Sequence, residues 1–144
     1  MISQKVKDYL ESKGWWFEEA SEAYKSALKK YGIEQSTDIS EFYCHAEDGP
    51  TFYSRQREIY QLGWFILNSD YALAIDRCHN ILKLPSIYIP LDSFEGESGF
   101  FYNKKTGEVI QLSLGKELQS LQEGTFKPQW NDFNSFVEWF FEIN

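Results

Sequence analysis

The fold is decided by the stretch Tyr88-Ile-Pro-Leu-Asp-Ser-Phe-Glu-Gly-Glu-Ser-Gly-Phe-Phe-Tyr-Asn-Lys-Lys-Thr-Gly-Glu-Val-Ile-Gln-Leu112. Around its start, Ile87, Ile89 and Leu91 alternate with other residues, which is typical of a strand with one buried face. Pro90 cannot donate a hydrogen bond to a neighbouring strand, so we expect this strand to lie at a sheet edge or to carry a bulge. The stretch therefore begins with a predicted strand.

Two turns and two further strands follow in the same stretch. The run Ser93-Phe-Glu-Gly-Glu-Ser-Gly99 holds two glycines, which permit a tight connection. The next strand begins at the end of this run, with Phe100 and Tyr102 on one face. Asn103-Lys-Lys-Thr-Gly107 is typical of a short hairpin loop that returns through Val109-Ile-Gln-Leu112. The sequence thus predicts a three-stranded antiparallel meander.

Helices are predicted in most of the remaining chain from apolar residues at helical spacing and from capping residues. The predicted helices cover residues 3–13, 18–31, a short segment after Ser36, 70–82, one or two turns within 113–124, and a terminal helix within 130–141. The segment 57–66 is ambiguous. We favour a strand over residues 58–62 with a turn near Gly63, and a helix is the alternative. The predicted fold is α+β, a single domain over residues 1–144 with helices packed around the meander.

The aromatic residues near the two ends of the chain have different predicted roles. The terminal helix carries one apolar stripe, formed by Trp130, Phe133, Phe136, Val137 and Phe140. This spacing predicts a buried helix face. Trp139 and Phe141 lie off the stripe and could face a second layer or a partner. The run Trp15-Trp16-Phe17 cannot point inward with all three rings, so we expect at least one ring to cover the domain edge or to contact another molecule.

The central stretch resembles a known family. Its segments Tyr88-Ile-Pro-Leu-Asp92, Glu95-Gly-Glu-Ser-Gly99 and Phe101-Tyr-Asn-Lys-Lys-Thr-Gly-Glu-Val109 are similar to the central sheet signature of the SUKH superfamily. This superfamily includes fungal cell-wall regulators and many bacterial toxin-immunity proteins. The resemblance implies a SUKH-like domain that binds a protein, and the signature is a fold pattern without a catalytic motif.

Three further segments add to the resemblance. Trp130-Asn-Asp-Phe-Asn-Ser-Phe-Val-Glu-Trp-Phe-Phe141 is similar to the closing helix of the family, in which a Trp and a capping turn precede a Phe-rich helix. Glu22-Ala-Tyr-Lys-Ser-Ala-Leu-Lys-Lys-Tyr31 resembles the early helix of the family. Glu47-Asp-Gly-Pro50 resembles its glycine-containing turn. The resemblance is therefore strongest over the second half of the chain.

Composition and charge restrict the class of protein. The chain has 144 residues, of which 42% are hydrophobic and 18% aromatic, and this content excludes a disordered chain. It has 22 acidic and 14 basic residues, a formal net charge of −8. Such a charge argues against a nucleic acid partner and favours a basic protein. The longest nearly uncharged stretch, residues 60–67, is too short to cross a membrane, and the amino terminus lacks the apolar core of a signal peptide. We expect a cytoplasmic protein.

The candidate partner-binding residues come from two of the three acidic groups in the sequence and from one aromatic residue. Glu18, Glu19 and Glu22 lie at a predicted helix start, where acids complement the helix dipole. The other two groups stand in turns, which are common binding elements when a rigid sheet holds them, although a solvated loop is the simpler interpretation. The candidate residues are Glu47, Asp48, Asp92, Glu95, Glu97 and Trp16.

Catalytic, cofactor and metal sites are not predicted. Glu95 and Glu97 could form the carboxylate pair of a glycoside hydrolase, but their position in a turn explains them as well. The dipeptides Cys44-His45 and Cys78-His79 supply a Cys₂His₂ set, but adjacent residues are poor chelates compared with the usual zinc spacing. We expect both cysteines to be free thiols, because two are too few for a secreted disulfide framework.

The leading functional hypothesis is an immunity protein that neutralises a cognate bacterial toxin, for which the resemblance is the reason. An acidic inhibitor can cover the basic surface with which a nuclease toxin holds its substrate. The alternatives are a regulatory module that binds endogenous proteins, a small carboxylate-dependent hydrolase, and a structural homodimer formed through Trp15 or Trp16. The oligomeric state stays open between monomer and homodimer.

Overall fold

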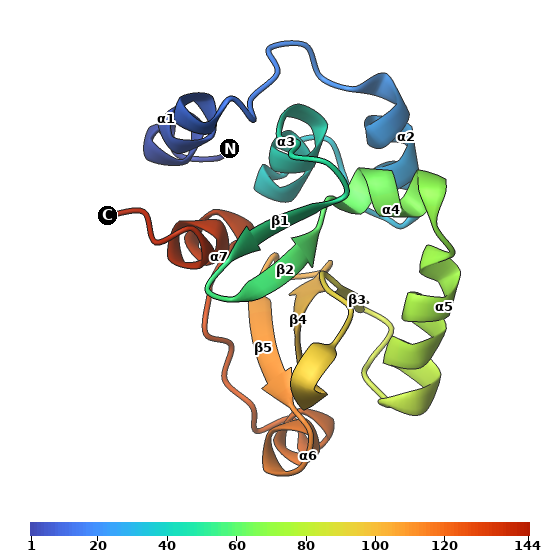
Figure 1. Cartoon of the computed structure of the whole chain (residues 1–144). Helices are drawn as coiled ribbons and strands as arrows, with labels where there is room; N and C mark the ends of the chain where they lie inside the picture. The colour runs from blue at the N-terminus through green and yellow to red at the C-terminus, as the bar shows by residue number, and fades with distance from the viewer.

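Two antiparallel sheets occupy the centre of the computed structural model, which describes residues 1–144 (Figure 1). The first sheet is the hairpin β1–β2, and the second is the meander β3–β4–β5. The strands are β1 (Thr51–Ser54), β2 (Arg57–Tyr60), β3 (Tyr88–Pro90), β4 (Ser98–Asn103) and β5 (Val109–Ser113). The helices are α1 (Gln4–Lys13), α2 (Glu22–Lys30), α3 (Asp38–His45), α4 (Leu62–Asn68), α5 (Tyr71–Asp76), α6 (Lys116–Glu123) and α7 (Phe133–Phe140). Together they form one compact α+β domain, as predicted.

The predicted meander is confirmed. β3 pairs with β4 through Ile89 opposite Tyr102, and β4 pairs with β5 through Phe101 opposite Ile110. β3 lies at the edge of the sheet, which is the position expected from Pro90. β4 and β5 pair in one regular antiparallel register up to the short loop that joins them. The sheet therefore holds the turns at its ends in place.

The prediction that β3 has a single buried face is wrong. Ile89 lies in the larger hydrophobic core, whereas the side chain of its neighbour Tyr88 lies in a second, smaller core on the other face of the sheet. The second core is closed by η1 (Arg77–Ile81), a π-helical turn that continues α5, and by α6. Because helical segments cover both faces, the alternation of residues along β3 separates two cores rather than core and solvent.

The helix predicted over residues 18–31 is shorter than expected. α2 begins at Glu22, because the Ser21 hydroxyl accepts a hydrogen bond from the backbone N–H of Tyr24 and caps the helix. Glu18 and Glu19 are exposed and lie before the helix, so only Glu22 stands in its first turn. The dipole explanation holds for that residue alone.

Residues 51–68 depart most from the sequence-based prediction. A strand is present at residues 57–60, but its partner β1 was not predicted, and the expected turn near Gly63 is instead the first turn of α4. The glycine serves a close helix–helix contact, because a Cβ atom at this position would lie 2.5 Å from Cγ of Tyr24 in α2.

The other predicted helices are confirmed in position. α1 ends at Gly14 in the left-handed region, and the predicted stripe is buried in α7 at Phe133, Phe136, Val137 and Phe140. Trp130 lies before the helix, forms an isolated bridge with Val109 and is only partly buried. Phe141, which lies off that stripe, is also buried, and its ring stacks on Tyr9 of α1. The helix predicted over residues 70–82 is α5 followed by η1, but the side chain of Asp70 makes no capping hydrogen bond. No helix combines the length and the apolar character that a membrane span requires.

Candidate functional site

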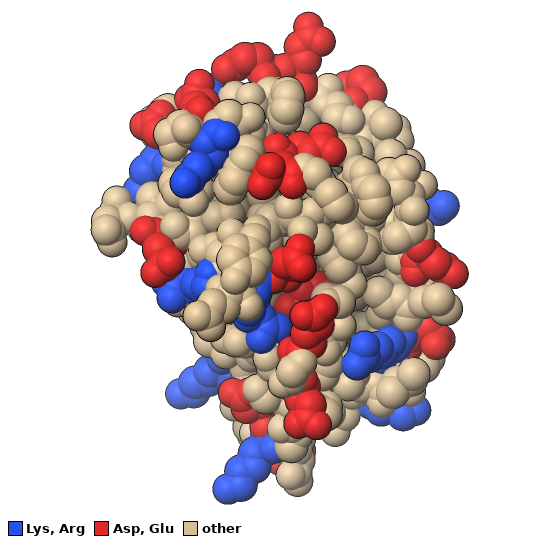
Figure 2. All heavy atoms as spheres, viewed as in Figure 1, with Lys and Arg blue, Asp and Glu red and all other residues tan.

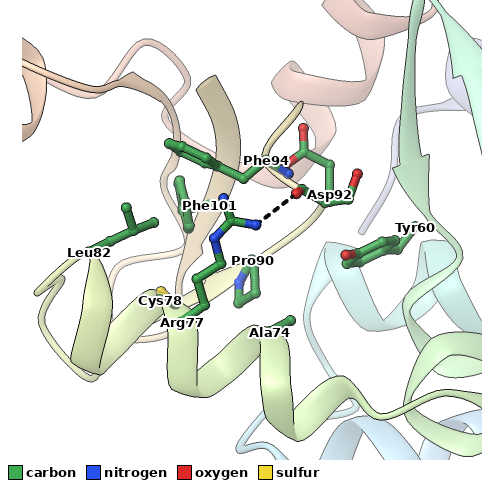
Figure 3. Close-up of a pocket in the computed structure, with 10 residues that line it drawn as sticks. Tyr60, Ala74, Arg77, Cys78, Leu82, Pro90, Asp92, Phe94 and Phe101 are labelled. Atoms are coloured by element: carbon green, nitrogen blue, oxygen red, sulfur yellow. Dashed lines mark hydrogen bonds between the residues drawn. The ribbon is translucent and has the colours of Figure 1, made fainter. Parts of the chain in front are cut away.

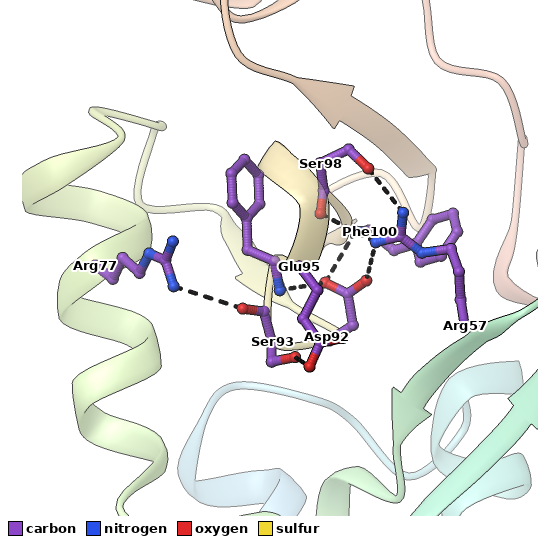
Figure 4. A network of polar contacts seen from close by, with 8 residues as sticks. Arg57, Arg77, Asp92, Ser93, Glu95, Ser98 and Phe100 are labelled. Atoms are coloured by element: carbon purple, nitrogen blue, oxygen red, sulfur yellow. Dashed lines mark hydrogen bonds and ion pairs between the residues drawn. The ribbon is translucent and has the colours of Figure 1, made fainter.

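Asp92 lies two residues after the end of β3 and is the centre of the candidate site (Figure 4). Only 3% of this residue is exposed. Its Oδ1 accepts hydrogen bonds from the backbone N–H groups of Phe94 at 3.1 Å and Phe100 at 3.3 Å. Its Oδ2 accepts a hydrogen bond from Nη2 of Arg57 at 2.9 Å. The carboxylate therefore holds the β3–β4 connection in place from inside.

Arg57 brings the first sheet to this carboxylate. The residue begins β2, and its guanidinium also donates to the hydroxyl of Ser98 at 2.7 Å and to the carbonyl oxygen of Ser98 at 3.0 Å. The same group stands 5.0 Å from the centre of the Phe100 ring. These contacts connect the β1–β2 hairpin to the start of β4, and they leave Arg57 largely committed within the chain.

Burial raises the pKa of Asp92 above its ordinary value. Desolvation disfavours the charged carboxylate, and this effect outweighs the opposing hydrogen bonds from Arg57, Phe94 and Phe100, which favour the charge. The structure thus corrects the expectation that Asp92 shares an exposed acidic turn with Glu95 and Glu97. Its charge faces Arg57 in the interior.

The turns on either side of this ion pair have unusual backbone conformations. Phe94 and Glu97 have φ of 58° and 63° in the β3–β4 connection, and Arg55 and Gln56 have φ of 52° and 61° in the β1–β2 hairpin turn. Non-glycine residues adopt such angles at an energetic cost, so the surrounding contacts must hold them. The Phe94 ring supplies one such contact, since it is buried in the smaller core.

A cleft lies beside the ion pair and consists of two adjoining cavities that share Asp92 and Ser93. Figure 3 shows the residues that line the inner one. The inner cavity measures about 60 Å³ and is mostly apolar. Tyr60 lies at one side of it, with its hydroxyl pointing toward the other labelled residues in Figure 3. The outer cavity measures about 250 Å³ and has only polar or glycine residues in its wall. Its lining residues are Gln56, Arg57, Glu58, Asp92, Ser93, Glu95 and Gly96.

Exposed carboxylates surround the outer cavity. Glu58 of β2 and Glu95 of η2 (Glu95–Glu97), the short 3-10 turn before β4, both line the cavity and are exposed. Glu97 is exposed at the end of the same turn. Figure 2 shows acidic side chains spread down this face, over the region where the β1–β2 hairpin meets the β3–β4 turn, with basic side chains beside them. Glu95 and Glu97 are therefore accessible to a partner, as expected.

The other predicted partner-binding residues form a separate group near α3. The ring of Trp16 stacks on His45 at a centroid distance of 4.7 Å, and Nζ of Lys7 lies 5.2 Å from the same ring. Glu47 accepts a hydrogen bond from the Tyr24 hydroxyl at 2.7 Å, whereas Asp48 is exposed. In the run Trp15-Trp16-Phe17, Phe17 is the exposed ring, with 53% of its surface accessible.

The two Cys-His dipeptides lie in different elements, the first in α3 and the second in η1. Cys44 and Cys78 are buried free thiols, as predicted. Nδ1 of His45 lies 2.7 Å from the carbonyl oxygen of Phe17, and Nε2 of His79 lies 2.7 Å from that of Tyr88. No three His, Cys, Asp or Glu side chains come together as potential metal ligands.

Among the cleft residues that sequence reasoning missed are Arg57, Glu58 and Tyr60. They belong to the ambiguous segment 57–66, and their approach to Asp92 depends on the packing of one sheet beside the other. The hairpin could have been suggested by the alternation of residues 51–60 around a polar centre. Comparison of the chain with protein-family models, with curated proteins and with solved structures finds no match in any of the three.

Proposed function

We propose that this chain is an immunity protein that binds a cognate toxin with a basic surface and neutralises it by direct contact in the cytoplasm. The resemblance of residues 88–109 to the SUKH superfamily suggests this class of protein and a SUKH-like fold. The structural observation that supports it is the position of Glu58, Glu95 and Glu97. These exposed carboxylates stand beside a buried ion pair that fixes β2, which carries Glu58, and the β3–β4 turn, which carries the other two.

A fixed acidic surface suits the inhibition of a basic toxin. Charge complementarity accelerates the encounter of the two proteins, and the bound inhibitor then excludes a negatively charged substrate such as a nucleic acid. Rigid turns lose little conformational entropy on binding, so more of the contact energy remains as affinity. The proposal requires no reaction of the inhibitor itself.

Co-expression with a candidate toxin taken from the neighbouring genes tests the proposal. We expect cells that express both proteins to survive, and the two proteins to co-purify. Survival without physical association would contradict neutralisation by direct contact. Association with endogenous proteins and no protection against the toxin would favour the alternative of a regulatory interaction module.

Neutral substitutions test the placement of the interface. In the combined variant Glu58→Gln, Glu95→Gln and Glu97→Gln, we expect association with the toxin to slow by about tenfold at low salt, because steering is lost. The salt dependence of the association rate should also weaken. Stopped-flow measurements over a range of salt concentrations provide the comparison.

The matched control is the combined variant Glu11→Gln, Glu34→Gln and Glu123→Gln. These residues are exposed and lie outside the cleft, and their substitution changes the net charge by the same amount. Equal slowing in both variants would place the interface elsewhere, because only the overall charge would then matter.

A further inference from the structure

The inner cavity of the cleft is lined by a hydroxyl group that bonds to no other residue of the chain. Tyr60 is only 9% exposed, and its hydroxyl forms no hydrogen bond within the chain. Burial, together with the nearby charge of Asp92, raises the pKa of Tyr60 to about 12, so the phenol is neutral and can both donate and accept a hydrogen bond. Because no residue of the chain pairs with it, this hydroxyl is available to a ligand that enters the cavity.

Tyr60 is held firmly in this orientation. Its ring stacks on Phe65 with a centroid distance of 3.9 Å, and its backbone N–H donates to the carbonyl oxygen of Leu91 at 2.8 Å. The ring of Tyr71 meets it edge-on at 6.2 Å. The hydroxyl therefore cannot leave the cavity to find another partner without breaking these contacts.

The walls and mouth of the cleft define the chemistry that it can accept. Pro90, Phe94 and Phe101 provide an apolar wall for the inner cavity, while Glu58 and Glu95 stand at the outer one. Such a combination suits a side chain with an aliphatic stem and a cationic head. The inner space of about 60 Å³ admits a head group of a few heavy atoms, since one water needs about 10–15 Å³.

Arg77 shows how a guanidinium lies in this cleft. Its Cζ stands 5.3 Å from the centre of the Phe94 ring, and its Nη1 lies 3.5 Å from the carbonyl oxygen of Ser93 (Figures 3 and 4). This hydrogen bond is long, the residue is exposed, and it takes part in none of the three ion pairs of the chain. Arg77 is therefore a weakly held cation that another cation can displace.

We propose that the cleft receives an arginine side chain of the protein partner, which displaces Arg77 from the ring of Phe94. The planar guanidinium has five donors in a fixed arrangement, which suits it to more than one acceptor in the cavity lining, such as the Tyr60 hydroxyl and the Ser93 carbonyl. The carboxylate of Glu95 then compensates the added charge. The inference rests on the proposed function, because it names the part of a basic partner that the cleft binds.

A blocked amino acid tests this inference without the toxin. In an NMR titration of the ¹⁵N-labelled chain, we expect N-acetyl-arginine methylamide to produce saturable shifts at Tyr60, Ser93 and Glu95. The neutral isostere N-acetyl-citrulline methylamide should bind about tenfold more weakly, because its head group lacks the charge. Equal binding of the two compounds, or shifts that do not include the cleft, would overturn the inference.

Two substitutions sharpen the test. Tyr60→Phe retains the stacked ring and removes only the hydroxyl, so binding of the blocked arginine should weaken about fivefold. Arg77→Gln removes the resident cation and should strengthen the binding of the blocked arginine about threefold. Lys105→Gln is the control, because it makes the same charge change at an exposed position outside the cleft. Equal effects of Arg77→Gln and Lys105→Gln would show that only overall charge matters and would reject the displacement of Arg77.

The two proposals fail in different ways. If blocked arginine does not bind but co-expression protects the cell, the arginine site is wrong and the immunity function stands. If blocked arginine binds with the expected dependence on Tyr60 and Arg77 but no protection occurs, the cleft is an arginine site and the immunity function is wrong.

Discussion

Arg57 and Asp92 are 35 positions apart in the sequence, yet Nη2 of Arg57 lies 2.9 Å from Oδ2 of Asp92. This ion pair connects the two-stranded sheet to the end of β3 and thereby sets the position of the exposed carboxylates around the cleft. Asp92 is buried and Arg57 is mostly so, with 3% and 24% of their side chains exposed. The position of these carboxylates therefore depends on the contact between the two side chains.

Substitution Arg57→Gln should lower the free energy of unfolding by about 2–4 kcal/mol, because it leaves the buried carboxylate of Asp92 without its counter-charge. Urea unfolding followed by tryptophan fluorescence measures the change. Arg77→Gln is the matched control, since Arg77 is exposed and makes no ion pair, and its effect should stay within about 0.5 kcal/mol. An equal effect of the two substitutions would show that the Arg57–Asp92 pair does not stabilise the fold.

The pKa of Asp92 predicts a specific pH dependence of stability. Burial raises this pKa in the folded state above its ordinary value of 3.8, so the folded chain binds the proton more readily than the unfolded chain. As pH falls through the folded-state pKa, the wild type should therefore gain stability relative to Asp92→Asn, and the gain should be complete below the ordinary value. Urea unfolding of both proteins between neutral and acidic pH gives the difference. A loss instead of a gain would mean that the hydrogen bonds of Asp92 outweigh its burial.

Gly63→Ala should destabilise the protein by about 1–3 kcal/mol, because the added methyl group would overlap the Tyr24 side chain. In the background of Tyr24→Ala the overlap is absent. There the same substitution should be neutral or stabilising by up to about 1 kcal/mol, since alanine favours a helix more than glycine does. The unfolding free energies of the wild type, the two single variants and the double variant show whether the effect of Gly63→Ala depends on Tyr24. If Gly63→Ala costs the same in both backgrounds, contact with Tyr24 is not the reason for the glycine.

The role of Gly63 also shows where prediction from the sequence failed. The meander and the helices follow from local periodicity and local caps, so they could be predicted. Gly63 has the local signature of a turn. Only its contact with Tyr24 of α2, which lies 39 positions earlier in the chain, explains its place within a helix. A contact between two helices leaves no local pattern in the sequence.

The same limit applies to the candidate site. Glu95 and Glu97 are exposed, as expected for carboxylates in a glycine-containing turn. Asp92 belongs to the same turn by sequence, but its burial depends on Arg57 from another sheet. Tyr60 was missed for the same reason, because its place in the cleft depends on how β2 packs against the end of β3. Local pattern thus predicted the exposure of Glu95 and Glu97, but neither the burial of Asp92 nor the residues that meet it.

The reactivity of the two cysteines measures how often the folded structure opens near the cleft. Burial raises the pKa of Cys78 to about 12, and it also raises that of Cys44, where a hydrogen bond with Ser40 opposes it in part. At about pH 8 we expect Cys78 in the folded chain to react with an aromatic disulfide reagent roughly a thousandfold more slowly than in urea, because only the thiolate reacts. The variants Cys44→Ser and Cys78→Ser assign the rates to each residue. Cys78 lies in η1 beside Arg77 and lines the inner cavity. Fast reaction of Cys78 in the folded protein, with Cys44 still protected, would mean that η1 opens by itself and that the cleft is not the rigid site described by its contacts.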